Sequence, residues 1–176
     1  MSDFDMALAH TLIHEGGWSD NRRDPGGATM QGVTLRVYRE YFGRTKSKSD
    51  LRHISDGELK HIYKNGYWDL CRCDELPSGV DLAVFDYAVN SGPSRSCKAL
   101  QKVVGTKQDG LIGPITLNAV MQMRPSEIIS RLIAARLGFL HRLSSWRYFG
   151  RGWTRRVKAV KAQAIRMAQN QTKIAA

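Results

Sequence analysis

The sequence predicts an all-α fold. Apolar residues recur at spacings of three and four along several segments, and helix-capping residues stand where those segments begin. No segment shows the convincing alternation of apolar and polar residues that is typical of a strand. With 176 residues, the chain is long enough to form one compact domain or two small lobes.

The N-terminal half contains three predicted amphipathic helices, each with apolar residues gathered on one face. Thr34 is the expected N-cap of the second helix. Ser55 and Glu58 have the spacing of a capping box at the start of the third. The expected ranges are 2–14, 34–42 and 55–63.

Residues 80–90 are apolar on nearly all sides, so we expect them to form a central buried helix. Leu82, Asp86 and Asn90 follow one another at a spacing of four and share one stripe. Buried aspartate and asparagine side chains need hydrogen-bond partners or a wet cleft. Asp86 is therefore either a hydrogen-bonded core acid or a second carboxylate of an active site.

A seam at residues 90–94, which contain Gly and Pro, divides the chain into residues 1–93 and 94–176. The second part continues with helical patterns, one of which has Pro114 at its expected first position. The last helix should have one apolar face and one basic face. The basic face is expected to carry Arg155, Arg156, Lys158 and Lys161.

The chain carries 27 Lys and Arg against 16 Asp and Glu, which gives a net charge of +11. All 16 acidic residues lie in residues 1–127, together with 16 of the basic ones, so the whole excess lies in residues 128–176. Such a field concentrates polyanions, which include nucleic acid, anionic lipid and bacterial cell wall. The alternative is a solvated basic helix that only aids solubility.

The sequence predicts no metal site and no cofactor. Cys71, Cys73 and Cys97 lack the spacing of metal ligands and are typical of reduced thiols in a cytoplasm. The first ten residues are acidic and have no apolar core segment, so we expect no Sec signal peptide. No apolar run reaches the ~18 residues that a membrane span needs.

The stretch HEGGWSDNRRDPGGAT, residues 14–29, combines one glutamate with glycine pairs and turn signals. We expect the first helix to stop at Gly16 and Gly17, which places Glu15 in its last turn. The negative end of the helix dipole and partial burial beside Trp18 would both raise the pKa of Glu15, as a general acid requires. The alternative is an exposed glutamate at a helix end.

Five segments of the chain form one recognisable series: HEGGWSDNRRDPGGATMQGVT, IYKNGYWD, LPSGVDLAVFDYAVNSGP, ALQKVVGTKQDGLIGPITL and FGRGWTRRV. They occur in the order found in glycoside hydrolase family 108, the bacterial and phage N-acetylmuramidases, and the chain resembles that family over nearly its whole length. The resemblance implies a lysozyme-like helical fold of two lobes packed as one body. It assigns residues 1–93 to a muramidase domain and residues 94–176 to a peptidoglycan-binding helical module. Residues that match this module include Leu100, Gln101, Asp109, Gly110, Gly113 and Thr116.

The family's catalytic glutamate precedes the glycine pair, so the resemblance assigns Glu15 the role of general acid. The bond cut would be the β-1,4 bond between N-acetylmuramic acid and N-acetylglucosamine. The spacing of Glu15, Asp24 and Thr29 resembles that in phage-type lysozymes, in which the aspartate and threonine hold the attacking water for inversion. The alternative for Asp24 is to anchor a turn through its side chain, since Asp-Pro-Gly-Gly is a strong turn signal.

Four further residues are candidates for substrate binding: Trp18, Gln31, Tyr87 and Asn90. Many family members have an aromatic residue where this chain has Gln31, so its sugar contacts should differ there. The alternative for Tyr87 is a place in the core, and that for Asn90 is a helix C-cap.

Bacterial peptidoglycan is the predicted partner, and an anionic wall or membrane surface could be reached through the basic C-terminal segment. We expect a monomer without a specific nucleic-acid partner, because no helix-turn-helix or RNA-binding motif is present. The protein should be made in a bacterial cytoplasm and act on peptidoglycan in the periplasm or wall, as a phage endolysin does during host lysis.

Three alternative functions remain open at the level of sequence. The first is a bacterial wall-remodelling muramidase that assists secretion, and the second is a non-catalytic cell-wall-binding protein. The third is a peptidoglycan amidase or endopeptidase, which would normally need zinc or a Cys–His pair. The five histidines show no HExxH motif, and no cysteine stands in a nucleophile context.

Overall fold

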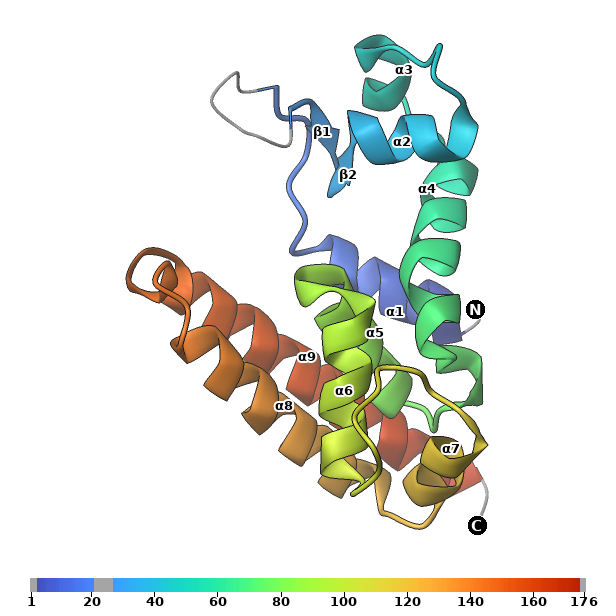
Figure 1. Cartoon of the computed structure of the whole chain (residues 1–176), viewed down its shortest axis with the longest axis vertical. Coiled ribbons are helices and arrows are strands. Elements are labelled where there is room, and N and C mark those ends of the chain that lie inside the picture. The colour runs from blue at the N-terminus through green and yellow to red at the C-terminus, as the bar shows by residue number, and fades with distance from the viewer. Residues whose placement is uncertain (1–2, 21–26, 175–176) are drawn as a thin grey trace.

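The computed structural model describes residues 3–20 and 27–174, with side chains as far as residue 171. Helices make up nearly all of its regular structure, so the predicted all-α fold is confirmed (Figure 1). The elements are α1 (Asp3–Leu12), β1 (Thr29–Met30), β2 (Val33–Thr34), α2 (Leu35–Phe42), α3 (Lys48–Arg52), α4 (Asp56–Tyr63), η1 (Lys64–Trp68), η2 (Asp69–Cys71), η3 (Cys73–Glu75), α5 (Val80–Ser91), α6 (Pro93–Val103), α7 (Pro114–Met121), α8 (Pro125–His141) and α9 (Trp146–Ile174).

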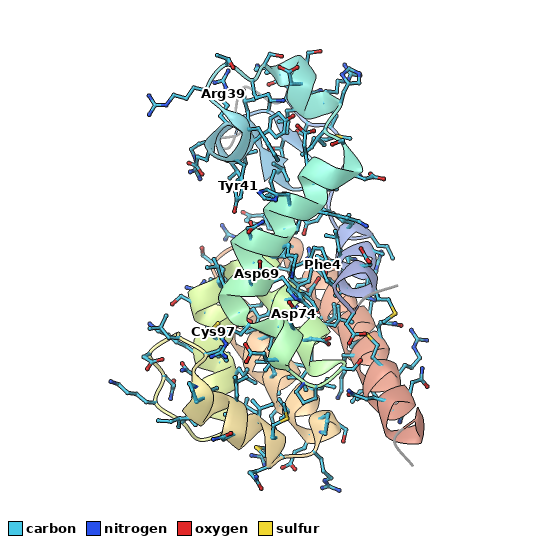
Figure 2. All side chains as sticks on the ribbon, turned by 90° about the vertical axis from the view of Figure 1, so that its right-hand side faces the viewer. Phe4, Arg39, Tyr41, Asp69, Asp74 and Cys97 are labelled. Atoms are coloured by element: carbon cyan, nitrogen blue, oxygen red, sulfur yellow. The ribbon has the colours of Figure 1, made fainter. Side chains whose placement is uncertain are left out.

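A small lobe and a larger helical body make up the molecule (Figure 1). The small lobe contains β1, β2, α2 and α3, and α4 runs from it into the body, as Figure 2 also shows. In the body, α5 packs against α1, α6, α8 and α9. Helices from both sides of the seam at residues 90–94 therefore share one core, and the predicted packing as one body is confirmed.

Helix α5 lies at the centre of the body, as the sequence predicts. Every one of its residues from Val80 to Ala88 is buried. The ring of Phe85 makes edge contacts with Phe4 and Trp68, at centroid distances of 6.0 and 5.4 Å. Phe4 lies near the lower end of α4 in Figure 2, so these aromatic contacts join α1 and η1 to the central helix.

Two helix starts have the side-chain caps that the sequence predicts. Thr34 Oγ1 accepts a hydrogen bond from the backbone N–H of Val37 at 3.2 Å. Ser55 and Glu58 form a reciprocal capping box at the start of α4. The backbone N–H of Ser55 is the main reason that the pKa of Glu58 falls to about 2.

The β1–β2 hairpin is a feature that the sequence analysis missed. Thr29 pairs with Thr34 and Met30 with Val33, and the antiparallel strands are joined through Gln31 and Gly32. Both of these residues have positive φ, +46° and +78°, as a two-residue type I′ hairpin turn requires. Strands of two residues are too short to show the alternating pattern by which strands are recognised.

The long helix α9 has the predicted apolar face. Val157, Val160 and Ala164 are completely buried, and α9 packs along α8 and against α5. The other sides of α9 carry exposed basic residues. Among the helices that the structure describes, none is both long and apolar enough to cross a bilayer.

Candidate active site

Glu15 lies just beyond the end of α1 rather than in its last turn. The chain tightens after Leu12, since the N–H of His14 bonds to Thr11 O at 3.0 Å and that of Glu15 to Leu12 O at 3.1 Å. Such i→i−3 bonds are common where an α-helix ends. The Glu15 side chain is 19% exposed, so it is neither a core residue nor the free helix-end glutamate of the alternative interpretation.

Arg156 of α9 holds the Glu15 carboxylate. Its Nη1 donates to Glu15 Oε1 at 2.7 Å across a sequence separation of 141 residues. The Arg156 side chain is only 9% exposed, so its predicted place on the exposed basic face of the last helix is wrong. The physical reason is that Arg156 lies beside the apolar stripe of Val157 and Val160, where its guanidinium pairs with the buried carboxylate of Asp86.

The second carboxylate that Arg156 contacts is Asp86. Arg156 donates from Nε at 3.1 Å and Nη2 at 2.9 Å, and Arg136 Nη1 adds a bond of 2.7 Å from α8. Burial alone would raise the pKa of Asp86, but the two guanidinium groups outweigh burial and hold the pKa below its usual range. Because Asp86 is completely buried, this geometry favours its interpretation as a hydrogen-bonded core acid.

The turn of the β1–β2 hairpin lies directly against Glu15. A Cβ atom at Gly32 would lie 2.9 Å from Glu15 Oε2 and 2.6 Å from Tyr63 Oη, so only glycine fits there. Tyr63 Oη also donates to the carbonyl of Gln31 at 2.8 Å, which fixes the turn. The structure therefore brings Gln31 into the neighbourhood of Glu15, and its role in substrate binding stays a prediction.

Tyr63 and Tyr67 are residues near the site that the sequence analysis did not select. Their rings lie 5.6 Å apart, and they stand at the end of α4 and in the π-helix η1. Burial, followed by the negative charge of Glu15, raises the pKa of both phenols, so both stay neutral near pH 7. The signal that could have pointed to them is the segment IYKNGYWD, and π-helical turns are frequent at functional sites.

Thr29 and Trp18 lie on the chain that leads into and out of the Asp24 segment. The backbone of Thr29 exchanges two hydrogen bonds with Ser19, at 2.9 and 2.8 Å, and its Oγ1 donates to Gly27 O at 3.2 Å. Trp18 is half-buried, with the Arg52 guanidinium 5.7 Å from its ring. Asp24 itself lies outside the described residues, so its role stays a prediction.

Tyr87 and Asn90 occupy different environments on α5. Tyr87 is 2% exposed, and its ring lies against the Arg136 guanidinium and the ring of Phe139. Such a position leaves almost no surface for a saccharide and fits the core alternative for Tyr87. Asn90 is partly exposed and accepts from Ser91 Oγ at 3.1 Å, one residue before α5 ends.

The cysteines are buried and unpaired by disulfides, and burial raises the pKa of Cys73. In the parts of the chain that the structure describes, His, Cys, Asp and Glu side chains form no group of three that could hold a metal ion. The described site offers one partly exposed carboxyl group, Glu15, between a guanidinium, two phenols and a tight hairpin turn.

Comparison with known proteins identifies both parts of the chain. The family described as Glycosyl hydrolase 108 matches residues 8–92, and the family described as Predicted Peptidoglycan domain matches residues 95–158. The chain is also similar to the solved structure titled "Structure of Brucella abortus SagA", with a TM-score of 0.84 and 43% sequence identity. That similarity covers 94% of this chain and 95% of the SagA chain. A search among curated proteins gives no match.

Proposed function

The chain belongs to the glycosyl hydrolase 108 family, and we propose that it is an N-acetylmuramidase with Glu15 as its general acid. The match to a peptidoglycan domain beside the hydrolase match makes it a peptidoglycan hydrolase. The proposed bond is the β-1,4 bond between N-acetylmuramic acid and N-acetylglucosamine. The observation that carries this assignment is the enclosure of the Glu15 carboxyl group by Arg156 and the Gly32 turn.

The two oxygens of Glu15 have different surroundings, and we infer that they have different roles in the reaction. Oε1 accepts a hydrogen bond from Arg156, whereas Oε2 faces the hairpin turn at Gly32. We assign the transferred proton to Oε2, from which it passes to the glycosidic oxygen as that bond breaks. The guanidinium of Arg156 then stabilises the carboxylate that remains.

Asp24 is our candidate for the second carboxylate, with Thr29 as its partner in holding the attacking water. Its negative charge would activate that water or stabilise the oxocarbenium-like sugar. The position of Thr29 supports this role, because β1 brings it back beside Ser19, close in sequence to Glu15. Trp18 and Gln31 are the proposed saccharide contacts on this side of the site, and Asn90 is proposed from α5. The same role for Tyr87 would require its ring to leave the core.

We place this activity in a phage endolysin that degrades the host wall. The division of the chain at residue 93 into muramidase and binding module is part of the same proposal, and the two family matches on either side of it support it. The similarity to a Brucella abortus protein favours the second candidate, a bacterial wall-remodelling muramidase. Cytoplasmic expression separates the two settings: an endolysin should lyse cells only once the inner membrane is permeabilised, whereas earlier lysis would indicate export.

The proposed reaction is tested by digesting purified peptidoglycan and identifying the new ends. Muramidase action yields reducing N-acetylmuramic acid ends, whereas new amino groups without reducing sugars would show an amidase or peptidase. Glu15→Gln keeps the shape but cannot donate the proton, so it should lower the rate by ~10² to 10⁴. Asp24→Asn should lose more than tenfold in rate with little change in melting temperature.

Controls for this experiment come from two exposed acids. Glu40→Gln removes a carboxylate that pairs with Arg36 on the surface of α2, and Asp20→Asn removes one that pairs with Lys48. Both variants should keep near-normal rates. Near-normal lysis by Glu15→Gln would overturn the assignment of the general acid.

A further inference from the structure

A pocket of about 550 Å³ lies on the exposed side of α9, near the start of the helix. Its lining combines four cations with two aromatic rings and small residues. The lining residues are Trp146, Arg147, Tyr148, Gly150, Arg151, Thr154, Arg155 and Lys158. We propose that this pocket binds the carboxylate groups of the peptide stems that peptidoglycan strands carry, next to the sugar chain being cut.

The charge of the pocket favours an anionic ligand. Residues 128–176 contain no acidic residue, and no ion pair within the described residues engages its four cations. Arg147 stands in the first turn of a 29-residue helix, where the positive dipole end adds to the field. Arginine forks bind carboxylates in bidentate geometry, so Arg147, Arg151 and Arg155 suit a chain with several carboxylates.

The lining of the pocket favours a chain that carries both apolar groups and carboxylates. The pocket is a shallow groove along one face of α9, and two aromatic rings stand among its cations. Trp146 is stacked on His141 at 3.8 Å, whereas Tyr148 is 69% exposed with the Arg147 guanidinium 4.6 Å from its ring. A stem peptide carries methyl groups that can contact these rings and carboxylates that can pair with the cations.

The position of the pocket links it to the proposed reaction, on which this inference rests. Arg155 lines the pocket, and the next residue, Arg156, holds Glu15. At 1.5 Å and ~100° per residue, Arg151 lies ~7 Å along the helix from Arg156 and ~140° around it. An extended stem of four residues spans up to ~14 Å, so a stem on a sugar bound near Glu15 has to pass around α9 to reach the pocket. In Figure 1 the start of α9 lies at the far left of the helical body, below and to the left of the β1–β2 hairpin.

The experiment compares peptidoglycan strands that carry their stems with the same strands after an amidase has removed them. The test variant combines Arg151→Gln, Arg155→Gln and Lys158→Gln. We expect the unchanged enzyme to release reducing ends from stem-bearing strands with at least tenfold higher kcat/KM. The variant should lose this preference through a higher KM and should cut stem-free strands at the normal rate. Equal losses on both substrates, or no loss on either, would overturn the proposal.

A matched control removes the same amount of charge elsewhere. Arg131→Gln, Arg142→Gln and Arg166→Gln together change three exposed cations that do not line the pocket. This control variant should keep the preference for stem-bearing strands. Loss of the preference in the control as well would show that net charge acts rather than the pocket, and would also overturn the proposal.

Direct titration separates this inference from the proposed reaction. A soluble stem tetrapeptide should bind the full-length protein, and its amide-capped form or the triple pocket variant should bind at least tenfold more weakly. If neither strand yields reducing ends, the proposed muramidase activity fails while this titration still decides the pocket. The protein could instead bind phosphatidylglycerol vesicles through the pocket and fail to bind the tetrapeptide. That result would identify a membrane surface as the ligand and overturn the proposal.

Discussion

Arg155 and Arg156 are neighbours on α9, yet they belong to two different regions of the molecule. Arg155 is exposed in the basic pocket, whereas Arg156 is buried between the carboxylates of Glu15 and Asp86. One residue along a helix is a rotation of ~100°, which is enough to move a side chain from solvent to the core. The positive charge of the C-terminal part is therefore divided between a buried network and exposed cations, four of which line the pocket.

The buried network joins two guanidinium groups to two carboxyl groups. Arg136 and Arg156 supply the guanidinium groups, and Asp86 and Glu15 supply the carboxyl groups. Nε and Nη2 of Arg136 are buried and have no hydrogen-bond partner in the described structure. A network that already leaves donors unpaired has little tolerance for the loss of another member. The exposed pocket carries no such constraint, because water solvates each of its cations.

The largest difference between the two regions should appear on removal of one cation from each. Arg156→Met leaves Asp86 to Arg136 alone and Glu15 without its guanidinium, so it should cost about 3–5 kcal/mol of unfolding free energy. Arg155→Met, the matched control, should stay within ~0.5 kcal/mol of the unchanged protein. Urea denaturation measures both values. Equal stability of the two variants would show that the contacts of Arg156 contribute nothing to folding.

The pairing of Arg156 with Glu15 also shows where prediction from sequence ends. The helices of residues 34–42 and 55–63 follow from caps and apolar spacing, which are local signals. The contact between Glu15 and Arg156 joins residues 141 positions apart, and no local pattern encodes it. The spacing of basic residues on α9 was compatible with a solvated face, so only the packed helices reveal that Arg156 turns inward.

The immediate surroundings of Glu15 were predictable only in part. The glycine pair and the resemblance to a family selected Glu15 itself, whereas Tyr63 and Gly32 reach it through tertiary packing. The hairpin turn consists of two residues between two-residue strands, too short for a periodic signal. Asp86 was ambiguous in sequence because burial and catalysis both favour an acid on an apolar helix, and its two arginine partners favour burial.

A second, pH-dependent comparison uses two buried aspartates on α5. Asp86 lies between two arginines, whereas Asp81 accepts only from the backbone N–H groups of Gly79 and Leu82 among its hydrogen bonds in the described structure. Burial raises the pKa of Asp81 to about 7, against those two hydrogen bonds. Asp86 has the opposite shift, since Arg136 and Arg156 overcome burial and lower its pKa. Cations, rather than depth of burial, decide which aspartate is ionised.

The two shifts predict opposite slopes of stability with pH. For Asp81 the native state binds more protons than the unfolded state between about pH 4 and 7, so stability falls as pH rises through that window. Asp81→Asn should abolish this loss of stability, which amounts to about 2–4 kcal/mol of unfolding free energy over the whole window. For Asp86, stability is present above the unfolded pKa and is lost as pH falls through the lower folded pKa. Asp86→Asn should remove that acid-side loss.

Unfolding free energies of the three proteins between pH 2.5 and 8.5 measure both slopes, with the unchanged chain as reference. At neutral pH, Asp86→Asn should also be less stable, because both arginines keep their buried charges without the carboxylate. Parallel curves for the two variants would contradict the assignment of opposite shifts.

The smallest expected effect is the coupling energy of a solvent-exposed ion pair on α8, the helix that also carries buried Arg136. Arg131 Nη2 lies 2.6 Å from Glu127 Oε1 in an i, i+4 pair, with side chains 58% and 34% exposed. The order of glutamate before arginine suits the helix dipole, but solvent screens the pair, so a coupling of about 0.3–0.5 kcal/mol is expected. A double-mutant cycle with Arg131→Ala and Glu127→Ala measures it, and the coupling should vanish in 1 M salt, where the Debye length is ~3 Å.

The same cycle for Arg136 and Asp86 should give a much larger coupling that survives the salt, because neither side chain is more than 1% exposed. If both couplings faded alike, the division of these charges into a buried network and an exposed set would have no energetic meaning.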